Sequence, residues 1–274
     1  MKLFIIFFYF LKDEININLR RIKKLYVFFK TFSIFRLLLY LFNKSIIPSR
    51  DKTFRNYILK NSKKWKNNND LKNLDNKKVL ITNILNHVGY TTTEIIIGKN
   101  VMEMFNADGI ALLNQYDLKQ ILLFKSFGIN KIIILKNFNI FVRLKYFIKS
   151  YSIIKSCKNM DEFLKFNINN VEIGKAVYDH YLRNTGIGTT NKFEPLFYVY
   201  LSKSLLIYDQ INEYLKKYKI IATVQSEIQF VPGFIIFQYA LSKGINVYSR
   251  VGVSNAFTVK KHSNFNEKHK PLER

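Results

Sequence analysis

The fold is decided by residues 79–135, which read VLITNILNHVGYTTTEIIIGKNVMEMFNADGIALLNQYDLKQILLFKSFGINKIIIL. Short apolar runs alternate there with longer segments of helical pattern. This alternation is typical of a parallel β-sheet whose strands are joined by crossover helices. Strands are predicted at 79–85, 109–113 and 131–135, and helices at 93–105 and 118–127.

The same alternation continues through the rest of the chain. The segment 139–166 is mostly of helical pattern, and a long amphipathic helix is predicted at 195–218. Gly128 and Gly244 stand where helices commonly end in a left-handed residue. A strand at 220–224, a helix at 233–243 and a strand at 245–251 complete the order. Residues 78–256 are therefore predicted to form an α/β domain with a Rossmann-like parallel sheet wrapped by helices.

The first 59 residues differ from this domain in charge and pattern. The chain of 274 residues has 44 basic and 19 acidic side chains, a formal charge of +25, and its first 78 residues alone hold 19 basic and 5 acidic ones. Residues 25–42 approach the length that spans a bilayer, but Lys30 and Arg36 make spanning costly. Residues 1–59 are predicted to be a basic amphipathic helical segment, which either lies on an anionic membrane surface or packs on the protein. Both interpretations stay open.

Three further segments have a simpler interpretation. Residues 1–11 are apolar but are too short to span a membrane, and no small-residue cleavage site follows them, so no signal peptide is expected. Residues 60–77 are rich in Lys and Asn and are predicted to be a solvated linker. Residues 257–274 are predicted to be a tail or a truncated interdomain connection.

The composition and the absence of known motifs limit which cofactors, partners and cellular compartment are expected. Cys157 is the single cysteine, which excludes an intramolecular disulfide and a cysteine zinc cluster and favours a reducing cytoplasm. The loop NHVGYTTT at 86–93 lacks the glycines of a dinucleotide fingerprint. No cofactor and no metal are therefore expected. The basic excess would attract phosphates or anionic lipid, but it is spread along the whole chain, so no nucleic-acid partner is expected.

Candidate site residues follow the strands, because ligands of such sheets bind where the strands end. His87 could act as a base near neutral pH, although a loop histidine is commonly an ordinary polar residue. Tyr90, in the same loop, and Ser226 are candidates for substrate binding. Glu227 follows an apolar strand, where partial burial would make its carboxylate a stronger base. Thr91–Thr93 are expected to cap the helix that follows.

A polar cluster lies in residues 171–190, VEIGKAVYDHYLRNTGIGTT. On a helix, Asp179 and Arg183 lie one turn apart, and Tyr178 shares a face with a second tyrosine three residues later. This arrangement could bind a sugar or a phosphate. The alternative is an ordinary surface helix with a charge ladder that ends at Gly186.

Together with 223–252, TVQSEIQFVPGFIIFQYALSKGINVYSRVG, this cluster resembles bacterial capsule and lipopolysaccharide biosynthesis proteins with a glycosyltransferase B-type fold. Lys175 stands where that pattern has an acid, and Glu227 stands where it has a histidine. The matching residues are Gly174, Tyr178, Asp179, Tyr181, Leu182 and Arg183 in the first block, and Ser226, Gly233, Ala240, Gly244 and Val247 in the second.

The resemblance implies transfer of a sugar from a nucleotide donor to a glycan or lipid-linked glycan acceptor, at the inner face of the cell membrane. Catalysis would be by Glu227 or His87, with substrate bound by Gly174, Tyr178, Asp179 and Arg183. The resemblance covers only the acceptor-side half of such an enzyme. It leaves three alternatives open: a fragment, a split enzyme whose donor-binding half is a second chain, or a degenerate copy. Two other classes stay open: a noncatalytic membrane-surface scaffold, and a basic nucleic-acid-binding protein.

Overall fold

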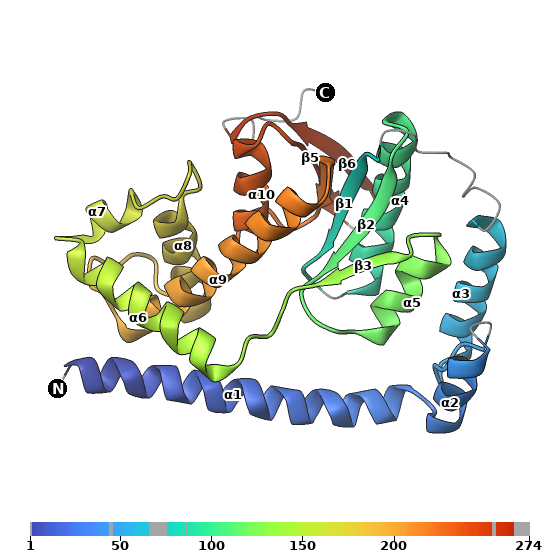
Figure 1. Cartoon of the computed structure of the whole chain (residues 1–274), viewed down its shortest axis with the longest axis horizontal. Coiled ribbons are helices and arrows are strands. Elements are labelled where there is room, and N and C mark those ends of the chain that lie inside the picture. Colours follow the sequence, from blue (N-terminus) through green and yellow to red (C-terminus); the bar gives the residue numbers. More distant parts are fainter. Residues whose placement is uncertain (1, 44–45, 66–75, 86, 254–255, 266–274) are drawn as a thin grey trace.

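The computed structural model describes residues 2–43, 46–65, 76–85, 87–253 and 256–265 (Figure 1). It confirms the predicted α/β class: one six-stranded sheet has the order β3-β2-β1-β4-β5-β6. The first five of these strands run parallel, and β6 pairs antiparallel with β5. The strands are β1 (Lys78–Asn83), β2 (Asp108–Leu113), β3 (Lys131–Ile134), β4 (Ile220–Gln225), β5 (Asn246–Val253) and β6 (Ala256–His262).

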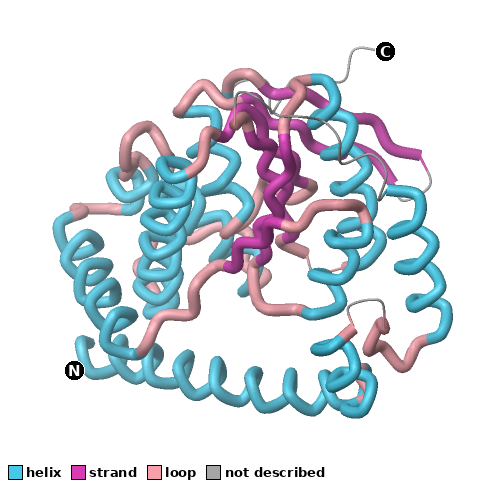
Figure 2. Tube along the Cα trace, turned by 45° about the vertical axis from the view of Figure 1, so that its right-hand side comes forward, coloured by secondary structure: helices cyan, strands magenta, loops and turns pink. Residues whose placement is uncertain are grey.

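Ten helices among the described residues surround this sheet, and Figure 2 shows them on both sides of the strands. Residues of β1 alternate between two cores, because successive side chains of a strand point to opposite faces. Leu80 packs with α6, α8, α9 and α10, whereas Val79 and Ile81 pack with α3, α4 and α5. The helices are α1 (Lys2–Thr31), α2 (Ile34–Phe42), α3 (Lys52–Trp65), α4 (Val88–Met104), α5 (Leu118–Ser126), α6 (Ile140–Ser156), α7 (Met160–Leu164), α8 (Ile173–Thr185), α9 (Pro195–Lys217) and α10 (Gly233–Ser242).

The N-terminal helices pack on the α/β body instead of standing apart from it. Ile6 and Phe10 of α1 are buried in the core that contains α9, and Phe54 and Ile58 of α3 are buried in the core that contains α5. In Figure 1, α1 runs along one edge of the molecule and α3 stands beside α5. The predicted helical segment is therefore present, and it contributes side chains to both cores.

Three predictions about local structure were wrong. The helix α4 begins at Val88, so Thr91–Thr93 lie inside it, and their hydroxyls donate to carbonyl oxygens four residues earlier, at 2.8–3.0 Å, instead of capping it. The helix α3 continues to Trp65, across the first six residues of the predicted linker; residues 66–75 lie outside the described part. Residues 256–262, of which 257–262 belong to the predicted tail, form β6, whose pairing with β5 depends on a partner distant in sequence.

Candidate functional site

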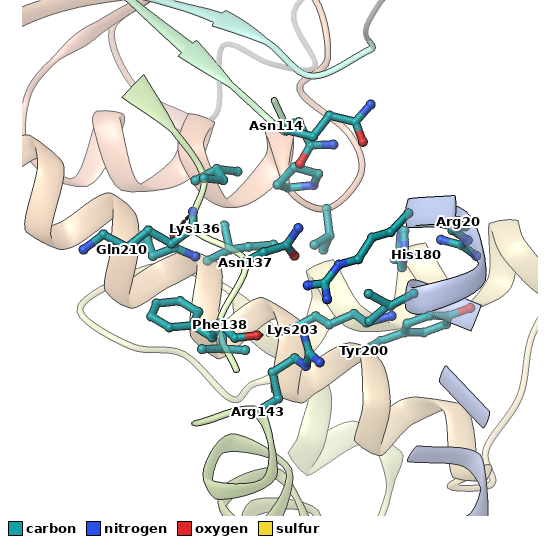
Figure 3. A pocket seen from close by; sticks show the side chains of 18 of the residues that line it. Arg20, Asn114, Lys136, Asn137, Phe138, Arg143, His180, Tyr200, Lys203 and Gln210 are labelled. Atoms are coloured by element: carbon teal, nitrogen blue, oxygen red, sulfur yellow. Dashed lines mark hydrogen bonds between the residues drawn. The ribbon is translucent and has the colours of Figure 1, made fainter. Parts of the chain in front are cut away.

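A cavity of about 390 Å³ lies where the parallel strands end. Its walls come from the segments that follow β2 and β3, from the loop before α10, and from α1, α6, α8 and α9 (Figure 3). Its volume falls in the range of about 300–1,000 Å³ that is common for small-molecule sites. Because ligands of open α/β sheets bind at this edge, the cavity is the strongest candidate site.

The lining of this basic cavity is cationic. Three of its cations come from α1, and the others come from the segment after β3, from α6 and from α9, which are far apart in sequence. None of the described lining residues is acidic. The cationic residues are Arg20, Arg21, Lys24, Lys136, Arg143 and Lys203, and His180 of α8 lies among them.

The cations that come from elements other than α1 are neutralised by carboxylates. The ammonium of Lys203 lies 2.7 Å from a carboxylate oxygen of Asp13, and Arg143 pairs with the buried Glu14. Lys136 lies 3.4 Å from Glu213 in an exposed pair. The pairs of Asp13 and Glu14 hold α1 against α9 and α6, so part of the positive charge of the basic cavity is structural.

The three cations of α1 have no such partners. Among the described residues, Arg20, Arg21 and Lys24 form no ion pair; Arg21 donates to Asn18 at 3.1 Å and Lys24 donates to Gln115. Their charges face the basic cavity, and no carboxylate of the described residues lies within ion-pair distance of them. A ligand with two or more negative charges would therefore be attracted to this wall.

Burial and the neighbouring cations lower the pKa values of two groups of the basic cavity. Burial, followed by the charges of Lys203 and Arg183, lowers the pKa of His180 to about 4, so its imidazole is neutral at pH 7. Burial, together with Arg20 and Arg21 and against the opposing effect of Asp117, lowers the pKa of Lys24. A bound anion would act on both groups in the opposite direction.

Neutral polar groups complete the wall. Asn114 follows β2, and the amide oxygen of Gln210 accepts from the backbone N–H of Lys136 at 2.5 Å. The ring of Tyr200 lies edge-on to His180, with 4.7 Å between centroids. Figure 3 shows Asn114, His180 and Tyr200 around the same space as the cations. The basic cavity can therefore offer charge to a phosphate and hydrogen bonds to a sugar or a base.

None of the residues predicted to be catalytic or to bind substrate lines this cavity. The structure does bring Arg183 and Glu227 together: a guanidinium nitrogen lies 3.9 Å from the carboxylate, and the guanidinium carbon lies 3.8 Å from the Phe230 ring centroid. The other carboxylate oxygen of Glu227 accepts from the backbone N–H groups of Gln229 at 2.7 Å and Phe230 at 3.1 Å. Glu227 thus shapes the loop between β4 and α10, which contributes Val231 and Pro232 to the cavity wall.

Residues of α8 that were predicted to bind substrate make internal contacts. The hydroxyl of Tyr178 lies 2.9 Å from that of Thr189 and accepts from the backbone N–H of Thr190 at 3.2 Å, which folds the following loop onto the helix. Gly174 is buried, and a Cβ atom at this position would lie 1.8 Å from the carbonyl oxygen of Phe163. Asp179 lies half-buried on the same helix. The helix ends at Gly186 in the left-handed conformation, as predicted.

The remaining predicted residues gather at the ends of β1, β4 and β5. His87 and Tyr90 meet edge to face with 5.6 Å between ring centroids, and the guanidinium carbon of Arg250 lies 4.8 Å from the centroid of the Tyr90 ring. The backbone N–H of Ser226 donates to Glu94 at 2.9 Å. This group lies beside the position where the strand order reverses between β1 and β4.

Glu94 was not predicted as a site residue. It is fully buried on α4, and this burial raises its pKa to about 8, against the opposing effects of the hydrogen bonds from Ser226 and the charge of Arg250. The one signal in the sequence was a carboxylate directly before the apolar run 95–97. The cations of α1 were singled out only as membrane contacts, because nothing local shows that a helix 90 or more residues upstream closes this edge of the sheet.

Comparison with family models, with curated proteins and with solved structures finds no match for this chain. In the described ranges, no three His, Cys, Asp or Glu side chains come together as a metal site. None of the helices in those ranges combines the length and the apolar character needed to cross a bilayer. The fold and the site define an α/β protein with a basic cavity at the ends of its parallel strands.

Proposed function

We propose that this protein takes part in bacterial surface polysaccharide synthesis as a glycosyltransferase-like protein, and that its basic cavity binds the diphosphate of a substrate. The substrate is a nucleotide sugar or a diphosphate-linked glycan acceptor, and the protein works at the inner face of the cell membrane. The observation that carries this proposal is the wall of three cations on α1, at the edge of the sheet where α/β proteins bind ligands.

The chemistry of transfer makes use of such a wall. An acceptor hydroxyl attacks the anomeric carbon, the bond from this carbon to the diphosphate breaks, and the hydroxyl proton passes to a base. Arg20, Arg21 and Lys24 would stabilise the negative charge that develops on the leaving diphosphate. His87 and Glu227 remain the candidate bases, and they lie on the neighbouring part of the same sheet edge.

Binding of soluble diphosphates tests this proposal without lipid. Calorimetry would compare uridine diphosphate, inorganic pyrophosphate and uridine on the full chain. Both diphosphates are expected to bind, more weakly as salt rises, and uridine alone is expected to bind much less. The double variant Arg20→Ala/Arg21→Ala should lower diphosphate affinity by at least about tenfold, because two charge-assisted contacts are lost.

A matched control removes the same charge from the same helix. Lys23→Ala/Lys30→Ala also deletes two exposed cations of α1, but neither lysine lines the basic cavity. Its diphosphate affinity should stay within about twofold of the parent chain, because long-range effects of exposed charges are screened. Equal losses in both double variants would show that the chain responds only to net charge, and the cavity assignment would then be wrong.

The noncatalytic scaffold remains the second candidate, because a large apolar surface of α1 and α2 is exposed. The two functions differ in one measurement. A scaffold would keep glycan assembly intact in cells that carry the Arg20→Ala/Arg21→Ala variant, whereas the glycosyltransferase-like function predicts loss of the polysaccharide at equal protein level.

A further inference from the structure

The helix α1 has two faces with different roles. Its inner face holds Ile6 and Phe10 in the core, pairs Asp13 with α9 and Glu14 with α6, and presents Arg21 to the basic cavity. Their spacings, of one, three, four and seven positions, place all of them on one side of a helix. On the opposite side of α1, large apolar side chains are exposed along most of the helix, within the described part of the chain.

That outer side has a continuous row of large apolar side chains. The row extends for roughly 40 Å, at about 1.5 Å per residue. Its members are three to four residues apart, and each is between 38% and 75% exposed. We call them the outer stripe: Phe4, Phe8, Leu11, Ile15, Leu19, Ile22, Tyr26 and Phe29.

This exposure is concentrated in one region of the molecule. Of the 29 large hydrophobic side chains that are exposed in the described part of the chain, 12 lie on α1 and 5 on α2. The helix α2 has no buried residue, and it exposes Ile34, Phe35, Leu38, Leu41 and Phe42. Contiguous apolar surface on this scale is uncommon in a monomer and marks an interaction surface.

The apolar surface also continues at the other end of α1. A hollow of about 530 Å³ lies between α1 and α6, and its lining is almost entirely apolar. Phe4 and Phe7 form one wall, and Leu144, Ile148 and Tyr151 are on the other. In both Figure 1 and Figure 2, α1 forms an outer edge of the molecule with no other segment beyond it.

The charges around the outer stripe show what could cover it. Lys12, Lys23 and Lys30 are exposed and lie along one border of the stripe, at spacings of 11 and 7 residues that return to the same side of a helix. The two carboxylates of α1, Asp13 and Glu14, turn inward and are paired. The border is thus cationic, and it is complementary to anionic lipid headgroups.

We propose that the outer stripe and the exposed face of α2 form a docking surface for an anionic lipid bilayer. The helix α1 lies in the plane of the interface, with the stripe below the headgroups and Lys12, Lys23 and Lys30 at the level of the lipid phosphates. This inference names the surface and its partner, and it holds whether or not the protein transfers sugars. Since Arg20 and Arg21 belong to the same helix, docking also places the basic cavity next to the membrane surface.

A second copy of this chain is a poorer occupant of the same surface. The chain has a formal charge of +25, so two copies repel each other, and the cationic borders of two stripes would be brought close together. An anionic bilayer, in contrast, is attracted by the same positive charge. The experiment therefore measures both lipid binding and oligomeric state.

Vesicle co-sedimentation of the full chain tests the proposal. The probes are phosphatidylcholine vesicles with and without phosphatidylglycerol. The parent chain should sediment with anionic vesicles, and less with neutral ones. The variant Leu19→Glu/Ile22→Glu should lower this partition by at least about tenfold, because two anchors are lost and two negative charges meet the headgroups.

The matched control is Ile96→Glu/Met104→Glu, which makes the same change at two exposed positions of α4. It should bind vesicles within about twofold of the parent chain. Circular dichroism and gel filtration check that both variants stay folded. Because the stripe is exposed, no core contact is lost in the first variant.

Two outcomes would overturn the proposal. One is equal vesicle binding by the stripe variant and the control. The other is a parent chain that ignores anionic vesicles but forms a dimer that Leu19→Glu/Ile22→Glu dissociates. Neither result affects the diphosphate measurements, which are made without lipid, so failure of membrane docking and failure of the proposed function can be told apart.

Discussion

The carboxyl ends of the parallel strands form one edge of the sheet, and the two halves of this edge differ in how their charged side chains are paired. Beside β2 and β3, the cations Arg20, Arg21 and Lys24 face a cavity and have no ion-pair partner among the described residues. Beside β1, β4 and β5, Glu227 and Glu94 bond to backbone N–H groups of the β4–α10 loop. The comparison teaches that carboxylates bonded to backbone N–H groups maintain the fold, whereas like charges that share a cavity without an ion-pair partner indicate a ligand site.

The largest expected effect concerns Gly174 of α8, a predicted site residue that does not line the basic cavity. Gly174→Ala places a Cβ atom 1.8 Å from the Phe163 carbonyl oxygen, so α7 or α8 must move. We expect a loss of about 3 kcal/mol or more in the free energy of unfolding. Denaturant unfolding measures it, and Gly188→Ala is the control, since nothing lies within 4 Å of a Cβ there.

If Gly174 instead contacted substrate, the alanine variant would keep its stability and lose ligand affinity. The distinction between residues that maintain the fold and residues that bind ligand would then fail at Gly174. Diphosphate affinity of any folded Gly174→Ala protein should match that of the parent chain.

The second effect depends on pH. The pKa of Glu94 is raised from 4.5 to about 8, so the carboxyl is protonated in the folded protein and ionised in the unfolded chain between these values. The unfolded chain therefore binds fewer protons, and stability falls as the pH rises through this window. Glu94→Gln should remove this loss and stabilise the protein by several kcal/mol at pH 8 while changing little below pH 4.

Thermal unfolding between pH 4 and pH 9 measures the difference between Glu94→Gln and the parent chain. Glu103→Gln on the same helix is the control, because Glu103 is exposed. A Glu94→Gln variant whose stability follows the parent curve at every pH would contradict the assignment of Glu94 as a protonated structural group.

The smallest effect on stability is expected at Glu227. One of its oxygens accepts both backbone N–H groups, and the amide oxygen of Glu227→Gln can do the same. The cost should be about 1 kcal/mol or less, with diphosphate affinity unchanged. A loss of sugar transfer by about 100-fold or more at unchanged stability would instead identify Glu227 as the base. Equilibrium unfolding and a transfer assay on the same preparation separate the two roles.

The sequence pattern predicted strands and helices well where the residues of one element are enough to define it. The strands at 109–113 and 131–135 and the helix at 195–218 lie within one residue of β2, β3 and α9, because apolar periodicity and end residues are local properties. The strand β6 was missed, because its formation depends on pairing with β5 at the edge of the sheet and not on the pattern of its own residues. The start of α4 was misplaced because the hydroxyls of Thr91–Thr93 bond inside the helix.

The candidate site was harder to predict. The rule that ligands bind beyond strand ends selected His87, Tyr90, Ser226 and Glu227, and these do lie at that edge of the sheet. It did not select the cations of the basic cavity, which come from four separate elements. Charge density in the first 78 residues marked α1 as basic, but which face of α1 turns inward depends on its packing against α9.

The sequence by itself determined the α/β class, the basic character of the N-terminal helices and the amphipathic pattern of α1, because composition and periodicity are properties of single segments. Only the tertiary structure decided that α1 closes the edge of the sheet, that Asp13 and Glu14 neutralise cations of α9 and α6, and that Arg20, Arg21 and Lys24 are left to face a cavity. The physical reason is that neutralisation depends on distances between residues more than 100 positions apart, which no local pattern encodes.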